Sequence, residues 1–126
     1  MQEKVGRLAR FIQENPAFAN VPFLVVAGRS VTPAEALALL QAGRYVEEVL
    51  VGLAKLGLDL PWELAEEFYR RLALARPEVR LYGLGFVPPL SPTECLEHVR
   101  ARDEVGRELV EAYARMLSFM REVLNA

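Results

Sequence analysis

The chain has 126 residues, of which 52% are hydrophobic and 25% are charged, and its formal net charge is −2. That length suits one domain, and this composition excludes intrinsic disorder and argues against a dedicated DNA-coating protein. The single cysteine, Cys95, excludes an intrachain disulfide and favours a reducing compartment. No apolar run is long enough to cross a bilayer. We therefore expect a cytoplasmic protein that does not contact membranes.

Arginine outnumbers lysine by 13 to 2, and asparagine and glutamine are scarce. A shortage of thermolabile amides is typical of thermophilic proteins. A GC-rich genome produces the same arginine bias, so a thermophilic origin is one of two explanations.

In the first part of the chain, apolar residues recur at helical spacing and prolines mark where helices should end. Val5, Leu8 and Ile12 recur at helical intervals, which predicts a helix from Gln2 to Glu14 that ends before a proline. The apolar stretch from Pro22 to Ala27 predicts a short buried strand or an extended connector.

The clearest helix start in the chain is Thr32-Pro33-Ala34-Glu35. It combines a capping hydroxyl, proline at the first helical position and glutamate at the third. The apolar pattern continues to about Leu56, and Gly43 breaks or kinks the helix on the way.

A similar order of elements follows in the second part of the chain. We expect a helix from Leu60 to Ala75, an extended segment from Val79 to Val87, and a second capping box at Ser91-Pro92-Thr93-Glu94. That box begins a last helix that continues to about Leu124. The chain is thus predicted to be an all-α bundle of four to five helices with two short extended segments, in a single domain over residues 1–126.

The two capping boxes suggest an internal duplication, with halves at residues 1–59 and 60–126. An offset of 59 residues aligns Thr32 with Ser91, Val46 with Val105, and several other apolar positions without gaps. The alternative is chance, because Ser/Thr-Pro-x-Glu is a common helix opening and leucine and alanine are frequent.

The last predicted helix has two adjacent apolar stripes, which together are wider than one neighbouring helix can cover. Asp103 is the one charged interruption. We predict that a partner chain covers part of this surface, and methionines suit such an adaptable contact. The alternative is a fully internal helix. The predicted interface residues are Leu109, Ala112, Met116, Phe119, Met120 and Val123.

A cluster of basic residues could contact phosphate groups, because arginine is well suited to phosphate recognition. Tyr69 and Tyr82 lie close enough in sequence to stack on bases. The alternative is a solvated helix face paired with Glu63, Glu66 and Glu67. The candidate nucleic-acid contacts are Arg70, Arg71, Arg76 and Arg80.

His98, the only histidine, lies near Glu94 and Cys95 at the start of the last predicted helix. Together these residues offer at most three metal ligands, whereas a closed zinc site needs four. We therefore expect no metal and no cofactor.

The sequence favours a non-enzymatic helical interaction or assembly module that forms a homo-oligomer or is the small subunit of a larger complex. The first alternative is a helical subunit that contacts nucleic acid through its arginines. The second is an enzyme with an unrecognised site near His98.

Overall fold

The chain is mainly helical. The computed structural model describes residues 2–82 and 88–125, and in these residues there are six α-helices, one 3-10 helix and two strands. This exceeds the four to five helices expected, because two of the predicted helices are each divided in two. The elements in chain order are α1 (Gln2–Glu14), η1 (Pro16–Phe18), β1 (Leu24–Val26), β2 (Arg29–Val31), α2 (Pro33–Gln41), α3 (Val46–Ala54), α4 (Trp62–Ala75), α5 (Pro92–Ala101) and α6 (Glu104–Leu124).

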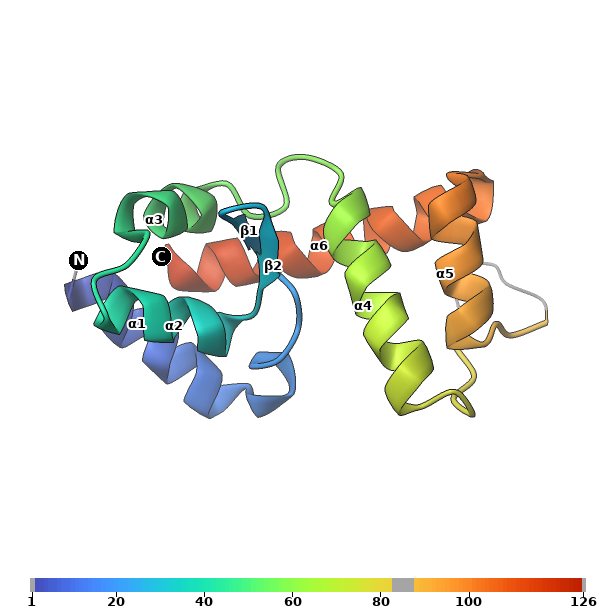
Figure 1. Ribbon diagram of the computed structural model, residues 1–126, viewed down its shortest axis with the longest axis horizontal. Helices are drawn as coiled ribbons and strands as arrows, with labels where there is room; N and C mark the ends of the chain where they lie inside the picture. The colour runs from blue at the N-terminus through green and yellow to red at the C-terminus, as the bar shows by residue number, and fades with distance from the viewer. Residues whose placement is uncertain (1, 83–87, 126) are drawn as a thin grey trace.

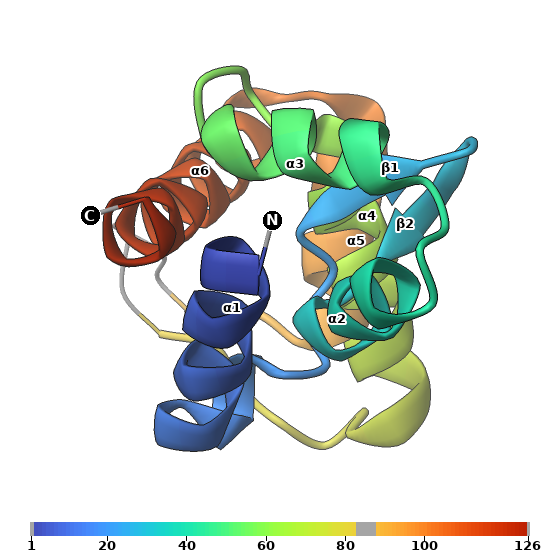
Figure 2. The same cartoon turned by 90° about the vertical axis from the view of Figure 1, so that its left-hand side faces the viewer.

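The elements form two groups that share the longest helix, α6. Helices α1, α2 and α3 lie at one end of the molecule, and α4 and α5 pack together at the other end (Figure 1). The β1–β2 hairpin lies between the two groups, where β1 contacts α3 and β2 contacts α4. Helix α6 contacts α4 and α5 as well as α1 and α3. Figure 2 shows the end of α6 beside α1 and α3, with the hairpin next to the start of α3 and away from α6. One helix therefore contributes to the packing of both groups.

The predicted strand at residues 22–27 is the first half of a hairpin. β1 and β2 pair in antiparallel register, with Leu24 opposite Val31 and Val26 opposite Arg29. The two-residue turn consists of Ala27 and Gly28, which both have positive φ, as the tight turns favoured in hairpins require. Leu24, Val26 and Val31 are buried, so the hairpin adds apolar side chains to an otherwise helical core.

The capping box predicted at Thr32 is present and begins α2. The Thr32 hydroxyl accepts a hydrogen bond from the Glu35 backbone N–H at 3.2 Å, and the Glu35 carboxylate accepts one from the Thr32 N–H at 3.0 Å. Gly43 has φ +68° and follows the end of the helix. Glycine adopts that conformation without a steric penalty. The predicted helix is therefore interrupted at Gly43, and α2 and α3 are separate helices.

The prediction of one continuous helix from Ser91 to Leu124 is wrong. Helix α5 ends at Ala101, and Arg102 adopts a left-handed conformation with φ +53°. The Asp103 carboxylate then accepts a hydrogen bond from the Gly106 N–H at 2.8 Å and caps α6. Asp103 interrupts the apolar pattern because it is a helix cap, and such caps are common for aspartate.

The second predicted extended segment lies partly outside the described residues, which omit 83–87. In the described part, Leu81 and Leu90 form an isolated antiparallel bridge directly before the Ser91 cap. In each half, a helix is followed by antiparallel pairing, a capped helix and a further helix. No helix in the described ranges has the length and apolar character needed to cross a membrane.

Candidate interaction surface on helix α6

Helix α6 buries one face in the protein and leaves part of its predicted interface on the surface. Leu109 and Met120 are only 2% and 0% exposed, so they belong to the core. Phe119 and Val123 are 49% and 41% exposed. Large apolar side chains with this exposure are candidates for a partner contact when they are grouped.

The exposed and half-buried members of the predicted interface lie on one stripe of the helix. Ala112, Met116, Phe119 and Val123 are separated by four, three and four residues, which is the spacing of a heptad seam. We call these four residues the α6 seam. Ala112 and Met116 are half-buried, and the other two are exposed. The seam is therefore a ridge whose second half is open to solvent.

Neighbouring elements cover the other faces of α6. Ser118 and Arg121 donate hydrogen bonds to the backbone carbonyls of Gly57 and Leu56, at 3.5 and 2.9 Å, on the side of the α3–α4 connection. Leu117 and Met120 face the core. Contacts on these sides leave the seam as the apolar part of α6 that the described elements do not cover fully.

Two charged residues flank the α6 seam on its solvent side. Arg115 precedes Met116, and Glu122 precedes Val123, so they occupy the same position in successive heptads. Both are exposed, and neither forms an ion pair with another residue in the ranges 2–82 and 88–125. Neither residue belongs to the interface predicted from the sequence, although two opposite charges seven residues apart beside an apolar seam can be recognised in the sequence.

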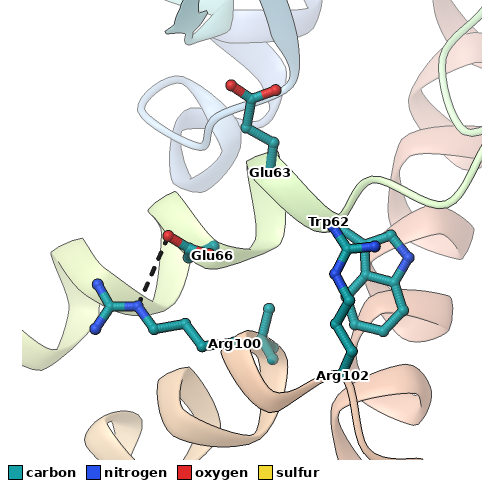
Figure 3. Close-up of a pocket in the computed structure, with 6 residues that line it drawn as sticks. Trp62, Glu63, Glu66, Arg100 and Arg102 are labelled. Atoms are coloured by element: carbon teal, nitrogen blue, oxygen red, sulfur yellow. Dashed lines mark ion pairs between the residues drawn. The ribbon is translucent and has the colours of Figure 1, made fainter.

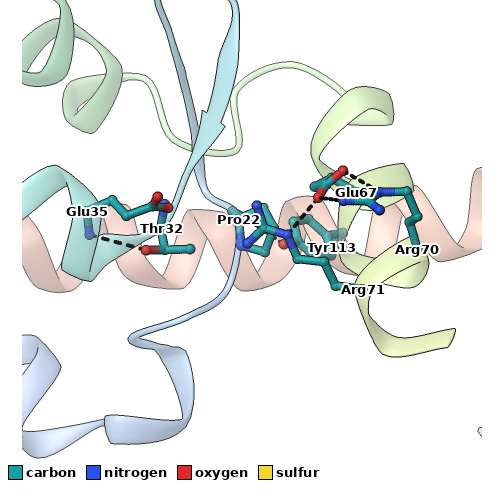
Figure 4. A network of polar contacts seen from close by, with 7 residues as sticks. All are labelled: Pro22, Thr32, Glu35, Glu67, Arg70, Arg71 and Tyr113. Atoms are coloured by element: carbon teal, nitrogen blue, oxygen red, sulfur yellow. Dashed lines mark hydrogen bonds and ion pairs between the residues drawn. The ribbon is translucent and has the colours of Figure 1, made fainter. Parts of the chain in front are cut away.

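The arginine cluster is partly neutralised by two neighbouring carboxylates. Glu67 lies 2.6 Å from both Arg70 and Arg71 (Figure 4). The hydrogen bond from Arg70, supported by Arg71, lowers the pKa of Glu67 to about 2. Arg76 pairs with Glu78 at 2.7 Å.

The rest of the candidate nucleic-acid surface is dispersed. Arg80 donates to backbone carbonyls, the shortest bond being 3.1 Å to Val79. Tyr69 is buried, whereas Tyr82 is exposed, so the two rings do not share one surface. Contact with nucleic acid therefore stays a prediction. The ion pairs of Arg70, Arg71 and Arg76 argue against it because they compete with phosphate groups.

The residues around His98 are each engaged in helix capping or in the core. His98 Nδ1 lies 2.7 Å from the Asp103 carboxylate. Glu94 accepts the Ser91 N–H at 2.9 Å in the second capping box. Cys95 is fully buried, and burial raises the pKa of its thiol to about 11. In residues 2–82 and 88–125, no group of three or more His, Cys, Asp or Glu residues could hold a metal ion.

A hollow of about 300 Å³ lies between the start of α4 and the end of α5. The Arg102 guanidinium lies over the Trp62 ring, 4.7 Å from its centroid, and Arg100 approaches Glu66 at 3.7 Å (Figure 3). The Trp62 face is thus covered by a cation of the same chain, and the lining charges are balanced. This arrangement stabilises the junction of α4 and α5 and offers no obvious ligand chemistry.

No protein-family model, no curated protein and no solved structure matches this chain.

Proposed function

We propose that the chain is a non-enzymatic assembly module that self-associates through the α6 seam. The observation that carries this proposal is the half-exposed pair Phe119 and Val123, in heptad register with Ala112 and Met116. Apolar side chains with that spacing pack into the gaps of a second helix. The proposal includes an intracellular site of action, since Cys95 is free and buried.

Charge complementarity favours an antiparallel pair of α6 helices. With a two-fold axis passing between Leu117 and Ser118, Phe119 of one copy packs on Met116 of the second copy. In the same register Arg115 faces Glu122 of the second copy, and symmetry forms that ion pair twice. A parallel pair leaves both charges without partners, because the flanking positions on the other side of the seam are buried.

The expected affinity of self-association through the α6 seam is modest. One helix pair buries an area at the low end of specific interfaces, so we expect association in the micromolar range. The two exposed ion pairs contribute about 0.2–1 kcal/mol each and set the register more than the strength.

Light scattering coupled to size exclusion, from low to high micromolar protein, tests the proposal. The wild type should move from 14.2 kDa towards twice that mass as concentration rises. A Phe119→Glu, Val123→Glu variant should stay monomeric and folded because both side chains are exposed. Leu74→Glu is the matched control, since Leu74 is 75% exposed on α4. A wild type that is monomeric throughout refutes self-association.

A charge swap tests the antiparallel register separately. Arg115→Glu and Glu122→Arg should each weaken dimerisation by placing like charges together, and the double variant should restore it. If the double variant is as weak as the single ones, the register is wrong even when the dimer exists.

The internal duplication is part of our proposal for the origin of this module. An offset of 59 aligns the buried residues of α2, Pro33, Ala36 and Leu40, with Pro92, Cys95 and Val99 of α5. It also aligns two left-handed residues, Gly43 with Arg102. Replacing residues 32–42 with residues 91–101 should preserve folding, whereas an unrelated capped helix of equal length should not. Loss of folding with both inserts contradicts a common origin.

A further inference from the structure

A groove of about 470 Å³ lies between the β1–β2 hairpin and α2, away from the α6 seam. One wall is strand β2 and its turn. The other wall is the α2 face that carries Ala38 and Leu39, together with Ala42 directly after the helix. Figure 2 shows the hairpin tip beside the loop between α2 and α3, and Arg44 and Tyr45 of that loop line the groove. The groove is thus bounded by a strand on one side and a helix on the other.

Strand β2 has an unpaired edge on the groove. In the described residues, β2 pairs only with β1. Val26 and Arg29 flank the two-residue turn and are therefore a hydrogen-bonded pair, so the next pair, Val25 and Ser30, directs its backbone N–H and C=O groups outward. Ser30 lines the groove. Such an edge can accept an extended segment as an additional strand.

The described residues that line the groove include two arginines and one glutamate, and the Glu48 carboxylate lies beside the turn at Ala27. Arg29 and Arg44 line the groove, and neither forms an ion pair with another residue of the described ranges. Arg44 lies over the Tyr45 ring, 5.8 Å from its centroid. The one carboxylate among the described lining residues, Glu35, is held by the Thr32 N–H in the capping box. The two arginines are therefore available to pair with an acidic ligand, whereas Glu35 and Glu48 are held by backbone N–H groups.

Two residues that line the groove, Ala27 and Tyr45, are held in a strained backbone conformation. Both have φ +52°, which is uncommon for residues with a side chain. The Ala27 N–H donates to the Glu48 carboxylate at 2.9 Å and ties the hairpin turn to α3. Residues held in sparsely populated conformations gather at binding sites.

We propose that this groove binds a short, extended, acidic peptide that adds to β2 as a third strand. The peptide backbone pairs with the outward groups of Ser30. Its apolar side chains pack on Leu39 and the alanines of α2, and its carboxylates face Arg29 and Arg44. The self-association of α6 is independent of this contact, so the two can be tested separately.

The probe is a fluorescein-labelled six-residue peptide of alternating glutamate and valine, measured by fluorescence anisotropy. It should bind the wild type, and a lysine–valine peptide should not. A version with proline at alternate positions should lose binding, because proline removes the N–H groups that strand addition needs. Equal binding of the acidic and basic peptides, or of the proline version, overturns the proposal, as does no binding at all. Displacement of the probe by hexanoate alone would assign the groove to small apolar anions instead.

Variants of the protein test whether the acidic peptide binds in this groove. Arg29→Glu and Arg44→Glu should each weaken binding by about fivefold, whereas Arg10→Glu, on the exposed side of α1, should not. Ala38→Trp fills the groove at an exposed position and should abolish binding in a folded protein. Binding should persist in the Phe119→Glu, Val123→Glu variant. Unchanged binding to Ala38→Trp places the peptide elsewhere and refutes the proposal.

Discussion

The hydroxyl of Tyr113 donates a hydrogen bond to the backbone carbonyl of Pro22, which lies 91 residues earlier in the chain (Figure 4). The bond is buried and connects the middle of α6 to the segment that leads into β1. The ring of Phe68, from α4, packs 5.4 Å from the Tyr113 ring. Tyr113 therefore joins both groups of elements at their junction.

Removing the Tyr113 hydroxyl should destabilise the fold. Tyr113→Phe leaves the buried Pro22 carbonyl without its donor, which costs roughly 1–3 kcal/mol. Urea unfolding followed by circular dichroism measures the loss. Tyr82→Phe is the control, because Tyr82 is 76% exposed and should give the wild-type value. Equal stability of both variants would contradict the role assigned to this bond.

Local signals in the sequence were sufficient to predict where α2 and α5 begin. The capping boxes at Thr32 and Ser91 form as expected, because proline, hydroxyl and carboxylate act within one turn. The break at Arg102 could not be predicted in this way, because arginine has no intrinsic preference for a left-handed conformation. The local signal for that break is Asp103, whose carboxylate caps α6.

Two glycines in helices should respond to alanine in opposite directions. A side chain on Gly106 would overlap with the His98 carbonyl where α5 and α6 meet. Gly106→Ala should therefore destabilise the protein by roughly 1–3 kcal/mol. Gly6, in α1, has open space around it, so Gly6→Ala should stabilise the protein by about 0.5–1 kcal/mol through helix propensity. Thermal unfolding of both variants measures these two changes in stability. A stabilising effect of Gly106→Ala would contradict the close contact between α5 and α6.

Stability should fall at alkaline pH, beginning with Cys95. Burial raises the pKa of this thiol to about 11, above its value in the unfolded chain. The neutral thiol thus stabilises the fold below about pH 9, and that contribution is lost as pH rises through 11. Burial also raises the pKa of Tyr69 and Tyr113, so their contributions are lost at higher pH still.

The test compares urea unfolding of the wild type and Cys95→Ala at pH 7, 9 and 10. The variant loses some packing at every pH but should show a flatter decline between pH 9 and 10. Parallel curves for the two proteins would show that Cys95 does not titrate in this window.

The interface on α6 could be predicted only in part from the sequence. Apolar spacing identifies Phe119 and Val123, which are exposed, but it also identifies Leu109 and Met120, which are buried. The two stripes are adjacent and equally apolar, so periodicity cannot tell which one the rest of the chain covers. Long-range packing of α1 and α3 against α6 decides this, and no local motif encodes it.

Binding to nucleic acid should be weak, and it should increase when Glu67 is neutralised. The wild-type ion pairs occupy Arg70 and Arg71. Since the pKa of Glu67 is about 2, this carboxylate stays charged in any practical buffer, and Glu67→Gln is the direct way to release both arginines. The substitution removes one exposed and one part-buried ion pair, so it should cost about 1–2 kcal/mol of stability. Binding of a labelled DNA single strand should strengthen in this variant, whereas Glu63→Gln is a control that leaves both ion pairs intact.

The wild-type affinity for single-stranded DNA should also depend on salt. With four arginines in contact with phosphates, this affinity should fall roughly sevenfold for each doubling of the salt concentration. Nanomolar wild-type binding at physiological salt would contradict this prediction and favour a nucleic-acid function.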